Sequence, residues 1–445
     1  MEARKRFMSI DPTKLPDPPR PSYTFTISDR DLFEKSKFEN YDSLLKNRLA
    51  RDQARANHLS SILKDGKAIG RNGTPTRREE VLEKTSTFSI SGDYVATFTL
   101  GSEEIKNHLL IDTASDLVWW QCGPCKANWC YQQDDPFYVY NNSKTYRRID
   151  CLVESTSCDI LSPQYECSPY GNTCLYDYKY ADGTRTRGWI ADDDITFVLD
   201  KSRIPILFGC GRNQMSGRGQ FYEEYSGIVG IGRREMVGGY SLPSQFKSYI
   251  MAMCLPLFES TKASTISFRR TPFKIVTSAG LVPNSKFPSF YYVNLYNVFI
   301  NDEEIPFDSS YWKFRHDMSG GVLVDTGMPI TRLPRIYYTL IRDTFIREVP
   351  QDILRYDGPL AANFDTCYTA DPGQESYFPV VKMYFGTQNP NNLLLLAHHR
   401  ILLPVSSGIY CLAFLPWDEP GAVIGNYQLQ GIGLTFDTAD NTLSF

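Results

Sequence analysis

The chain contains no run of eighteen apolar residues, and its first residues, Met-Glu-Ala-Arg-Lys-Arg, lead into a polar, proline-rich stretch instead of a hydrophobic leader. The first absence excludes a membrane-spanning helix of ordinary length. The second gives no secretory signal, although the cysteine content described below calls for an oxidising compartment. We therefore expect the true N-terminus to be missing or misassigned.

Histidine is also scarce, with five in 445 residues. Their positions fit neither a metal-ligand spacing nor a nucleophile-base arrangement, so all five are interpreted as surface or structural residues and no metal or cofactor is expected. These residues are His58, His108, His316, His398 and His399.

Positive charge is depleted from most of the chain. The net charge is −4, but residues 1–85 hold 18 Lys and Arg against 13 Asp and Glu, so that the acidic excess belongs to the remainder. An acidic body argues against nucleic acid as a partner. A basic segment before an acidic body instead fits a pro-segment that lies over an acidic cleft.

What the chain has in quantity is cysteine, proline, glycine and aromatic residues, the last at 13%. This composition is typical of a β-rich globular protein with many turns. Nine of the eleven cysteines precede residue 255, which indicates a disulfide framework and a secreted protein, and the sequon at Asn141 predicts glycosylation there. A redox or zinc site at Cys122-Gly123-Pro124-Cys125 is the alternative, although neither a βαβ pattern nor a second ligand pair accompanies it.

Two short runs repeat one pattern, an apolar strand that ends in Asp-Thr-small. The first run ends in Asp112-Thr113-Ala114-Ser115 and the second in Asp325-Thr326-Gly327. One such run is a common strand end. Two runs, each followed later by an apolar stretch into glycine (227–232 and 422–426), indicate two similar lobes that present two carboxylates to one reaction.

The order of segments follows from composition. Residues 1–27 are polar and proline-rich and are predicted to be disordered, and leucines at 44, 45, 49, 59 and 63 predict an amphipathic helix. A glycine-containing linker follows at 65–78. Residues 1–85 are thus predicted to be pro-segment and linker, 86–275 the N-terminal lobe and 276–445 the C-terminal lobe. Further helices are expected at 333–345 and from 242.

The chain resembles the pepsin-like aspartic proteases, in their plant nepenthesin-like branch, from about residue 90 to the end. The resemblance is carried by the two Asp-Thr turns, Trp119, the cysteines after Gln121, Tyr180-Ala181-Asp182-Gly183-Thr184, Phe208-Gly209-Cys210-Gly211 and Phe364-Asp365-Thr366-Cys367-Tyr368. It implies an all-β-dominated, bilobal fold of two six-stranded lobes around a central cleft, with few short helices. It also implies an acid-active endopeptidase without cofactor, a monomer that acts on peptide or protein and is secreted to the apoplast or vacuole.

The resemblance also assigns roles to residues. It makes Asp112 and Asp325 the catalytic pair, with Thr113, Ser115, Thr326 and Gly327 as supporting residues. Tyr180, Asp182, Gly183 and Thr184 form a mobile flap over the substrate, and Trp119 packs beneath it with its indole N–H in a hydrogen bond. The pairings implied for the cysteines are Cys122–Cys125, Cys130–Cys210, Cys151–Cys174, Cys158–Cys167 and Cys367–Cys411, with Cys254 as a free thiol.

Two residues depart from the family's pattern. Ala114 takes the place of a glycine, which is tolerable if the backbone φ stays negative. Met328 takes the place of a Thr or Ser, and a thioether cannot donate a hydrogen bond to Asp325, so the ionised form of that carboxyl should be less favoured. These departures keep open the alternative of a weakened or inactive binding protein of the xylanase-inhibitor type.

Overall fold

The computed structural model describes residues 23–34, 38–65, 94–126, 128–152, 158, 165–168, 171–180, 183–197, 201–216, 220–233, 241–257, 260–358, 364–371 and 373–445. The predicted disordered residues 1–22, the predicted linker residues 66–78 and the flap residue Asp182 lie outside these ranges.

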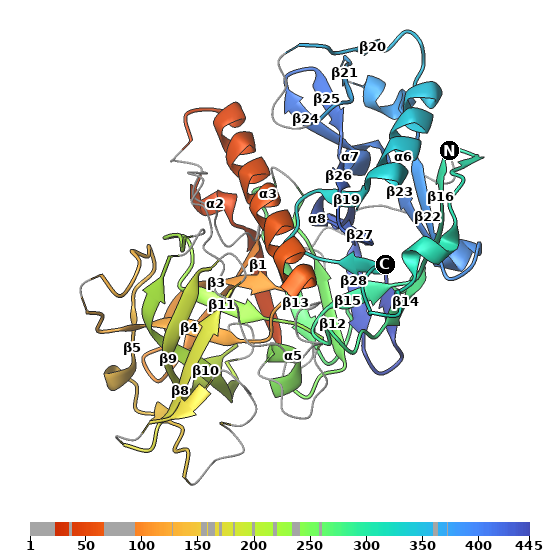
Figure 1. Ribbon diagram of the computed structural model, residues 1–445. Helices are drawn as coiled ribbons and strands as arrows, with labels where there is room; N and C mark the ends of the chain where they lie inside the picture. The colour runs from red at the N-terminus through yellow and green to blue at the C-terminus, as the bar shows by residue number, and fades with distance from the viewer. Residues whose placement is uncertain are drawn as a thin grey trace, which may run out of the picture.

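The chain folds into two β-rich halves with one long helix between them, as Figure 1 shows. The described strands of the first half after residue 93 are β2 (Tyr94–Leu100), β3 (Ile105–Asp112), β4 (Val118–Gly123), β5 (Tyr138–Val139), β6 (Arg147–Arg148), β7 (Tyr165–Cys167), β8 (Cys174–Lys179), β9 (Arg185–Thr196), β10 (Arg203–Met215), β11 (Gly227–Gly230), β12 (Ile250–Cys254) and β13 (Ser264–Phe268). Helix α5 (Leu242–Gln245) begins where the sequence predicted one.

The second half contains β14 (Ser278–Val282), β15 (Tyr291–Val293), β16 (Leu295–Ile300), β17 (Glu303–Glu304), β18 (Val322–Val324), β19 (Thr331–Pro334), β20 (Leu354–Arg355), β21 (Cys367–Thr369), β22 (Val381–Phe385), β23 (Leu393–Leu396), β24 (Leu402–Ser406), β25 (Ile409–Leu412), β26 (Phe414–Trp417), β27 (Ala422–Ile424), β28 (Gly433–Asp437) and β29 (Thr442–Ser444). Its helices are α6 (Arg335–Glu348), α7 (His398–Ile401) and α8 (Asn426–Leu429). Helix α6 begins two residues later than predicted because Leu333 and Pro334 extend β19 alongside β26.

The predicted all-β-dominated, bilobal class is confirmed, with one difference in how the strands are connected. One 21-stranded sheet runs through both halves, and two four-stranded sheets, β17-β16-β22-β23 and β20-β21-β25-β24, belong to the second. The halves join because β12 pairs antiparallel with β28, from Ile250 opposite Asp437 to Cys254 opposite Gly433. The strands that lead into the two Asp-Thr turns, β3 and β18, both belong to this sheet.

A strand from the N-terminal segment is part of that sheet. Strand β1 (Thr24–Asp29) pairs antiparallel with β13 on one side and with β2 on the other. The prediction that residues 1–27 are disordered is therefore wrong for residues 24–27. Phe25 and Ile27 are buried among core aromatic rings, and burial of these two side chains outweighs the polar composition that precedes them.

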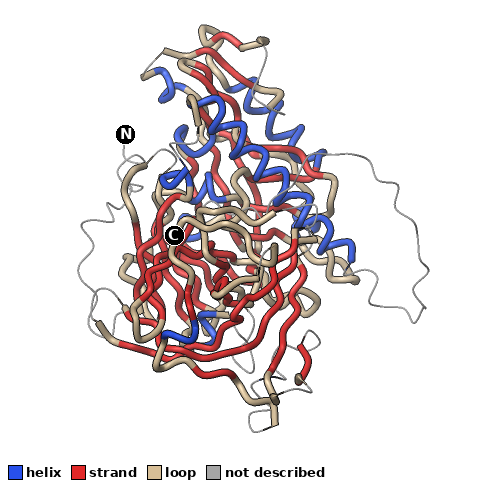
Figure 2. The backbone as a smooth tube through the Cα atoms, turned by 90° about the vertical axis from the view of Figure 1, so that its left-hand side faces the viewer, coloured by secondary structure: helices blue, strands red, loops and turns tan. Residues whose placement is uncertain are grey.

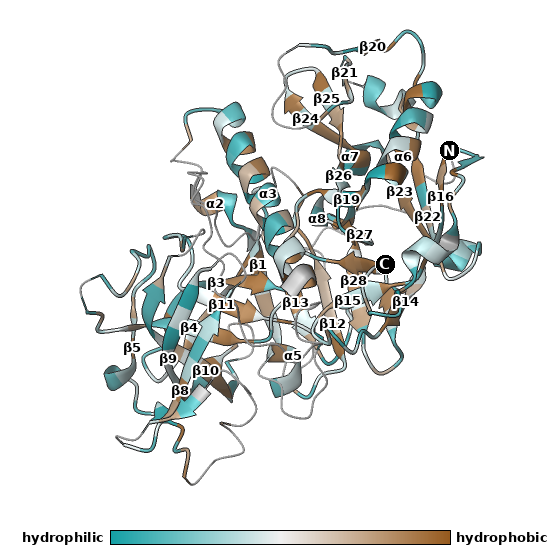
Figure 3. Cartoon of the chain, in the orientation of Figure 1, coloured by the Kyte–Doolittle hydropathy of each residue, from teal (hydrophilic) through white to brown (hydrophobic). Residues whose placement is uncertain are grey.

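Helix α3 (Tyr41–Asp65) is the long helix between the halves, and it confirms the helix predicted from the leucine pattern. Figure 2 shows it running across the strands of the body, and Figure 3 shows polar and apolar residues alternating along it. A short helix, α2 (Asp31–Glu34), joins it to β1. Leu45 and Leu49 pack against Ile330 and Tyr427 of the second half, so α3 belongs to the folded body.

Four of the predicted disulfide pairings are wrong. Cys122 of β4 bonds to Cys210 of β10, because these two strands run side by side in parallel with Trp120 opposite Cys210. The loop after β4 then closes on itself through Cys125–Cys130. The hairpin of β7 and β8 brings four cysteines together, and they pair as Cys151–Cys167 and Cys158–Cys174.

The disulfide Cys367–Cys411 is present as predicted, and Cys254 is a buried free cysteine. Asn141 is exposed in a short 3-10 helix (Tyr140–Asn142), where a glycan would have access to solvent. Within the described residues, no helix is long and apolar enough to cross a membrane.

Candidate active site

Asp112 and Asp325 lie at equivalent places in the two halves. Asp112 ends β3, which runs parallel to β11 with Gly230 opposite Asp112. Asp325 directly follows β18, which runs parallel to β27 with Ile424 opposite Val324. In both halves, the strand that carries the aspartate is therefore paired with the apolar run into glycine that the sequence repeats. The two carboxylates are buried, with Asp112 4% and Asp325 0% exposed.

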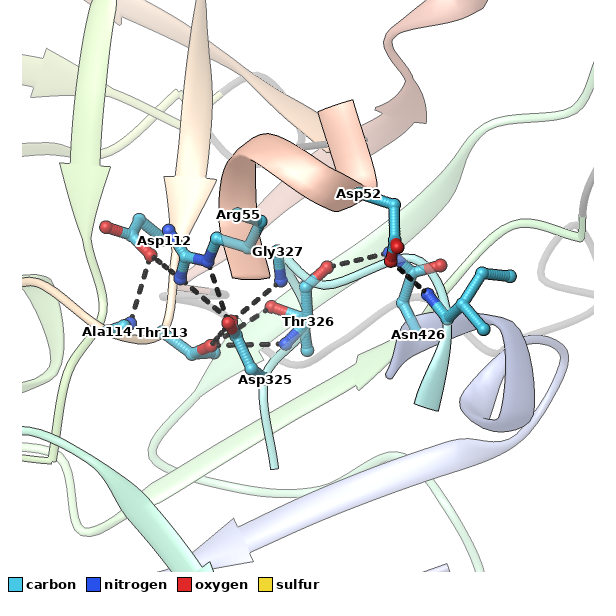
Figure 4. Close-up of polar contacts among 10 residues, drawn as sticks. Asp52, Arg55, Asp112, Thr113, Ala114, Asp325, Thr326, Gly327 and Asn426 are labelled. Carbon is cyan, nitrogen blue, oxygen red and sulfur yellow. Dashed lines mark hydrogen bonds and ion pairs between the residues drawn. The ribbon is translucent and has the colours of Figure 1, made fainter. Parts of the chain in front are cut away.

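The two turns hold their carboxylates in the same way. The backbone N–H of Ala114 donates to Asp112 Oδ1 at 3.0 Å, and that of Gly327 donates to Asp325 Oδ1 at 2.9 Å. The turns also touch each other, because Thr113 Oγ1 donates to Asp325 Oδ1 at 3.1 Å and accepts from the backbone N–H of Thr326 at 3.2 Å. These contacts fix the two carboxylates face to face across the boundary between the halves (Figure 4).

The two departures from the family's pattern have different consequences. Ala114 keeps a negative φ, so its methyl group brings no backbone strain. Met328 is fully buried and gives Asp325 no side-chain hydrogen bond. Thr113 donates to Asp325 from the opposite half, so this carboxylate still has a hydroxyl partner. Ser115 is also buried; it helps to lower the pKa of Asp112, although its Oγ makes no hydrogen bond of standard geometry.

Arg55 of α3 lies between the two carboxylates, as Figure 4 shows. Its Nη2 donates to Asp112 Oδ1 at 2.7 Å and to Asp325 Oδ1 at 2.9 Å, and its Nε donates to Asp325 Oδ2 at 2.7 Å. A planar guanidinium has the fork of donors that such bridging requires. It lies so close over Gly327 that a Cβ there would be 3.0 Å from its Cζ. A side chain at residue 327 would thus displace Arg55.

The charge of Arg55 dominates the electrostatics of the pair. Burial acts to raise the pKa of Asp112, but the charge of Arg55 and the hydrogen bonds to the carboxylate outweigh it and hold this pKa below its usual value. The two carboxylates in turn raise the pKa of Arg55. His58, one turn further along α3, has its pKa lowered to about 4 by burial and by the charge of Arg55. His58 was predicted to be a surface or structural residue; it is partly exposed and lies within the field of the aspartates.

Further polar contacts attach α3 to the second half. Asp52 accepts from the backbone N–H of Ile330 at 2.9 Å and forms an ion pair with Arg332 in which both side chains are buried. The hydroxyl of Tyr41 donates to the carbonyl oxygen of Pro404 at 2.6 Å, and Ser60 donates to Glu419. The helix is therefore bound along its whole length, and it covers the carboxylates.

Basic residues of α3 also hold the N-terminal segment together. Arg48 Nη2 contacts Asp29 at 2.8 Å and its Nε contacts Asp31, while Arg51 contacts Asp31 at 2.7 Å. All of these side chains are buried. The ion pairs therefore tie α3 to the end of β1 while the helix is docked.

The predicted flap is a hairpin of β8 and β9. The backbone N–H of Tyr180 donates to the carbonyl of Thr184 at 2.8 Å, and Gly183 adopts the left-handed φ of +86° that favours glycine. The indole N–H of Trp119 donates to the hydroxyl of Tyr180 at 2.8 Å, which confirms the hydrogen bond predicted for Trp119. Tyr180 is 4% exposed and packs against Tyr178 at 4.9 Å between ring centres.

Sequence reasoning missed Arg55. The sequence predicts a basic segment and an amphipathic helix. Helix α3 carries Arg48, Arg51 and Arg55 at spacings of three and four residues, and this pattern alone does not identify which arginine reaches the carboxylates. One sequence signal that points to Arg55 is the alanine on either side of it. Two small side chains allow this part of the helix to pack closely against its partner.

Comparison with known proteins gives consistent matches. The family described as "Xylanase inhibitor N-terminal" matches residues 94–268, and "Xylanase inhibitor C-terminal" matches residues 290–445. Among curated proteins, "Protein ASPARTIC PROTEASE IN GUARD CELL 2" of Arabidopsis thaliana is 31% identical over 97% of this chain and 89% of its own length. "Aspartic proteinase nepenthesin-1" of Nepenthes gracilis is 29% identical over 81% of this chain and 79% of its own.

Solved structures agree on the fold. The structure titled "Crystal structure of edgp" superposes with a TM-score of 0.65 at 21% identity, over 81% of this chain and 92% of that one. Basic 7S globulin from soybean gives a TM-score of 0.60 at 18% identity, over 79% and 92%. At these identities the likeness concerns the fold alone.

Proposed function

Because the chain belongs to the family of plant aspartic proteases, we propose that it is the precursor of an endopeptidase that hydrolyses peptide bonds at acidic pH with Asp112 and Asp325. One observation carries the proposal. A single guanidinium nitrogen, Arg55 Nη2, lies within 2.9 Å of both carboxylates, so the two acids are close enough to act on one small group.

The mechanism follows from this proximity. Two carboxylates at hydrogen-bonding distance from one group cannot both ionise cheaply once Arg55 leaves, so they share one proton. The ionised partner accepts a proton from a water molecule, and that water attacks the peptide carbonyl. The protonated partner donates a hydrogen bond to the carbonyl oxygen, and a proton then passes to the leaving nitrogen. Tyr180 closes over the peptide and excludes water.

In the proposed precursor, residues 1 to about 85 are an inhibitory pro-segment, and the described part of this segment includes β1 and α3. Arg55 neutralises both carboxylates, and α3 lies where a substrate would reach them. Activation then requires α3 to leave, with a cut in the linker at 66–85. The predicted boundaries at residues 85 and 275 remain proposals of the same kind, as do the glycosylation of Asn141, the monomeric state and the apoplastic or vacuolar location.

A cleavage assay tests the enzymatic function. A full chain with a specific protease site at 74–79 is cut there and incubated at acidic pH with a denatured protein. We expect fragments from the wild-type chain and a loss of several orders of magnitude with Asp112→Asn or Asp325→Asn, because either change removes the shared proton. Asp302→Asn, an exposed aspartate of the second half, is the matched control and should change nothing. Near-normal turnover by either dyad variant would refute the assignment.

A second candidate function is a non-catalytic binding protein of the xylanase-inhibitor type. It is favoured by the family descriptions that match both halves and by Met328 in place of a hydroxyl residue. The same assay separates the two, since a binding protein gives no fragments even after its linker is cut.

A further inference from the structure

Arg400 is a buried arginine of the second half that the proposed function does not use. It belongs to the short helix α7, which lies beside α8 (Figure 1), and it is 1% exposed. Its backbone N–H donates to the carbonyl of Ala397 at 2.8 Å, and its carbonyl accepts from Gln428 Nε2 at 2.9 Å. Its Nε donates to the carbonyl of Gln430 at 3.1 Å. These contacts hold the guanidinium in one place.

The charge of Arg400 lacks a counter-charge within the described part of the chain. No carboxylate there forms an ion pair with it, and its Nη1 is buried and meets no acceptor among the described residues. Burial lowers the pKa of Arg400 to about 10, so the side chain stays charged at neutral and acidic pH. A buried charge without a partner is costly. The other arginines that are buried in the described ranges each have a carboxylate partner; they are Arg30, Arg48, Arg51, Arg55 and Arg332.

Arg400 lies close to the place where the two halves join, which we call the seam and which consists of strands β12 and β28 with the residues next to them. Gln430, which accepts from Arg400 Nε, is followed by Gly431, whose backbone N–H donates to the carbonyl of Leu255 at 2.9 Å. Leu255 directly follows Cys254, the last residue of β12. The guanidinium is therefore near the thiol of Cys254, and each acts on the pKa of the other.

A buried hydroxyl borders the same place. Ser264 is the first residue of β13 and is 2% exposed, and its Oγ makes no hydrogen bond of standard geometry within the described ranges. Burial raises the pKa of Cys254 to about 11, and both the Ser264 hydroxyl and the charge of Arg400 act against this rise, so both groups lie near the sulfur. Ala252 and Phe273 pack against Cys254 and make the surroundings apolar. A cation and a hydroxyl thus meet in an apolar setting.

We propose that the seam contains a binding site for a small monovalent anion such as chloride, held by Arg400 Nη1 and Ser264 Oγ. This inference is independent of the proposed endopeptidase function, because it involves neither aspartate. An anion satisfies both the charge of Arg400 and the unused hydrogen-bonding capacity of the two side chains, whereas a water molecule satisfies only the second. The ion is small because both residues are at most 2% exposed. Bound there, it links α7 of the second half to β13 of the first.

Thermal unfolding of the uncut full chain at neutral pH measures the site in solution. Sodium chloride replaces sodium gluconate up to about 100 mM, so that the ionic strength stays constant. We expect Tm to rise by about 1–3 °C and to reach a plateau, because an ion that binds only the folded chain stabilises it. Arg400→Met should abolish most of the rise, and Ser264→Ala should reduce it. Arg315→Met, at an exposed arginine of the second half, is the matched control and should keep it.

Crystals grown with sodium bromide locate the ion directly, because bromide gives an anomalous signal. We expect a peak at hydrogen-bonding distance from Arg400 Nη1 in the wild type and none in Arg400→Met. Arg400→Gln, which keeps a polar side chain, replaces Arg400→Met if that variant does not fold.

Three outcomes overturn the proposal. The first is a wild-type Tm that chloride leaves unchanged, which means that water or another group fills the place. The second is an equal rise of Tm in the wild type and the Arg400 variant, which assigns the effect to other parts of the chain. The third is a bromide peak without any chloride-dependent Tm, which is binding at crystal concentration only.

Discussion

Arg55 and Asp325 form a two-point contact, with Nε at 2.7 Å from Oδ2 and Nη2 at 2.9 Å from Oδ1. Both side chains are buried, so neither charge has water as an alternative partner. Removal of one partner from such a pair usually costs about 3–5 kcal/mol. This contact, with the one to Asp112, is the strongest polar link between α3 and the aspartates.

The first prediction concerns this link. Arg55→Ala should weaken the docking of α3 and give the uncut full chain measurable peptidase activity. The uncut wild-type chain should show no activity. Arg55→Lys should stay mostly inactive because a lysine keeps the positive charge, and any activity above wild type would reflect its inability to bridge both carboxylates. Asn57→Ala, on the exposed side of the same helix, is the control. An uncut Arg55→Ala chain as silent as wild type would mean that the remaining contacts of α3 suffice for inhibition.

The second prediction concerns pH. His58 titrates at about 4 when α3 is docked and near 6.5 when it is free, so the free form binds more protons between these values. Docking is therefore fully stable above pH 6.5 and weakens as the pH falls towards 4. Asp112, whose pKa is lowered by Arg55 despite burial, adds a second loss of docking as the pH falls further, because the two aspartates take up their shared proton once Arg55 has left. Susceptibility of the linker to a protease should rise in these two steps.

His58→Gln tests the assignment of the upper step, since glutamine does not titrate. The variant should lose the step that His58 contributes between about pH 6.5 and pH 4 and keep the step that the aspartates contribute. His316→Gln, in the second half of the chain, is the matched control and should keep both steps. A variant at residue 58 with an unchanged upper step would assign that step to another group.

The third prediction concerns the flap. Tyr180→Phe leaves the buried indole N–H of Trp119 without its acceptor, which should lower the free energy of unfolding by about 1–3 kcal/mol. It should also reduce kcat of the activated chain, because the closed hairpin loses its contact with the body. Tyr377→Phe, at a 62% exposed tyrosine, should change neither quantity. Chemical denaturation and steady-state kinetics measure the two effects, and an unaltered stability would contradict the hydrogen bond.

The fourth prediction concerns the cysteines. Burial raises the pKa of Cys254 to about 11, so this thiol should resist alkylation in the native protein and react only after unfolding. Peptide mapping without reduction should then find label on Cys254 alone and the bridges Cys122–Cys210 and Cys125–Cys130. A peptide that contains Cys122 joined to Cys125 would restore the pairing that we expected from the family.

The sequence was sufficient for the features that repeat. The duplicated Asp-Thr turns and the two later runs into glycine identified the segments that form β3, β11, β18 and β27, because a strand pattern and its turn are local properties, whereas the pairing of these strands was not predicted. The leucine spacing likewise predicted α3. Both features depend on residues close together in the sequence.

The features that the sequence did not predict depend on which distant residues meet. Cys122 pairs with a cysteine 88 residues away because β4 and β10 are neighbours, and no local pattern specifies that neighbour. Strand β1 was not predicted because its partners, β2 and β13, begin about 70 and 240 residues later in the sequence. Arg55 is the same case, since its contacts to Asp112 and Asp325 span 57 and 270 residues.

The position of β1 determines what a cut in the linker can accomplish. Its backbone forms hydrogen-bonded ladders with strands on both sides, and Arg48 fastens its last residue, Asp29, to α3. A strand inside a sheet leaves only when both ladders open together. We therefore expect linker cleavage to produce first a two-chain protein whose chains copurify. In this product β1 of the short chain stays in the sheet even after α3 has moved away from the carboxylates.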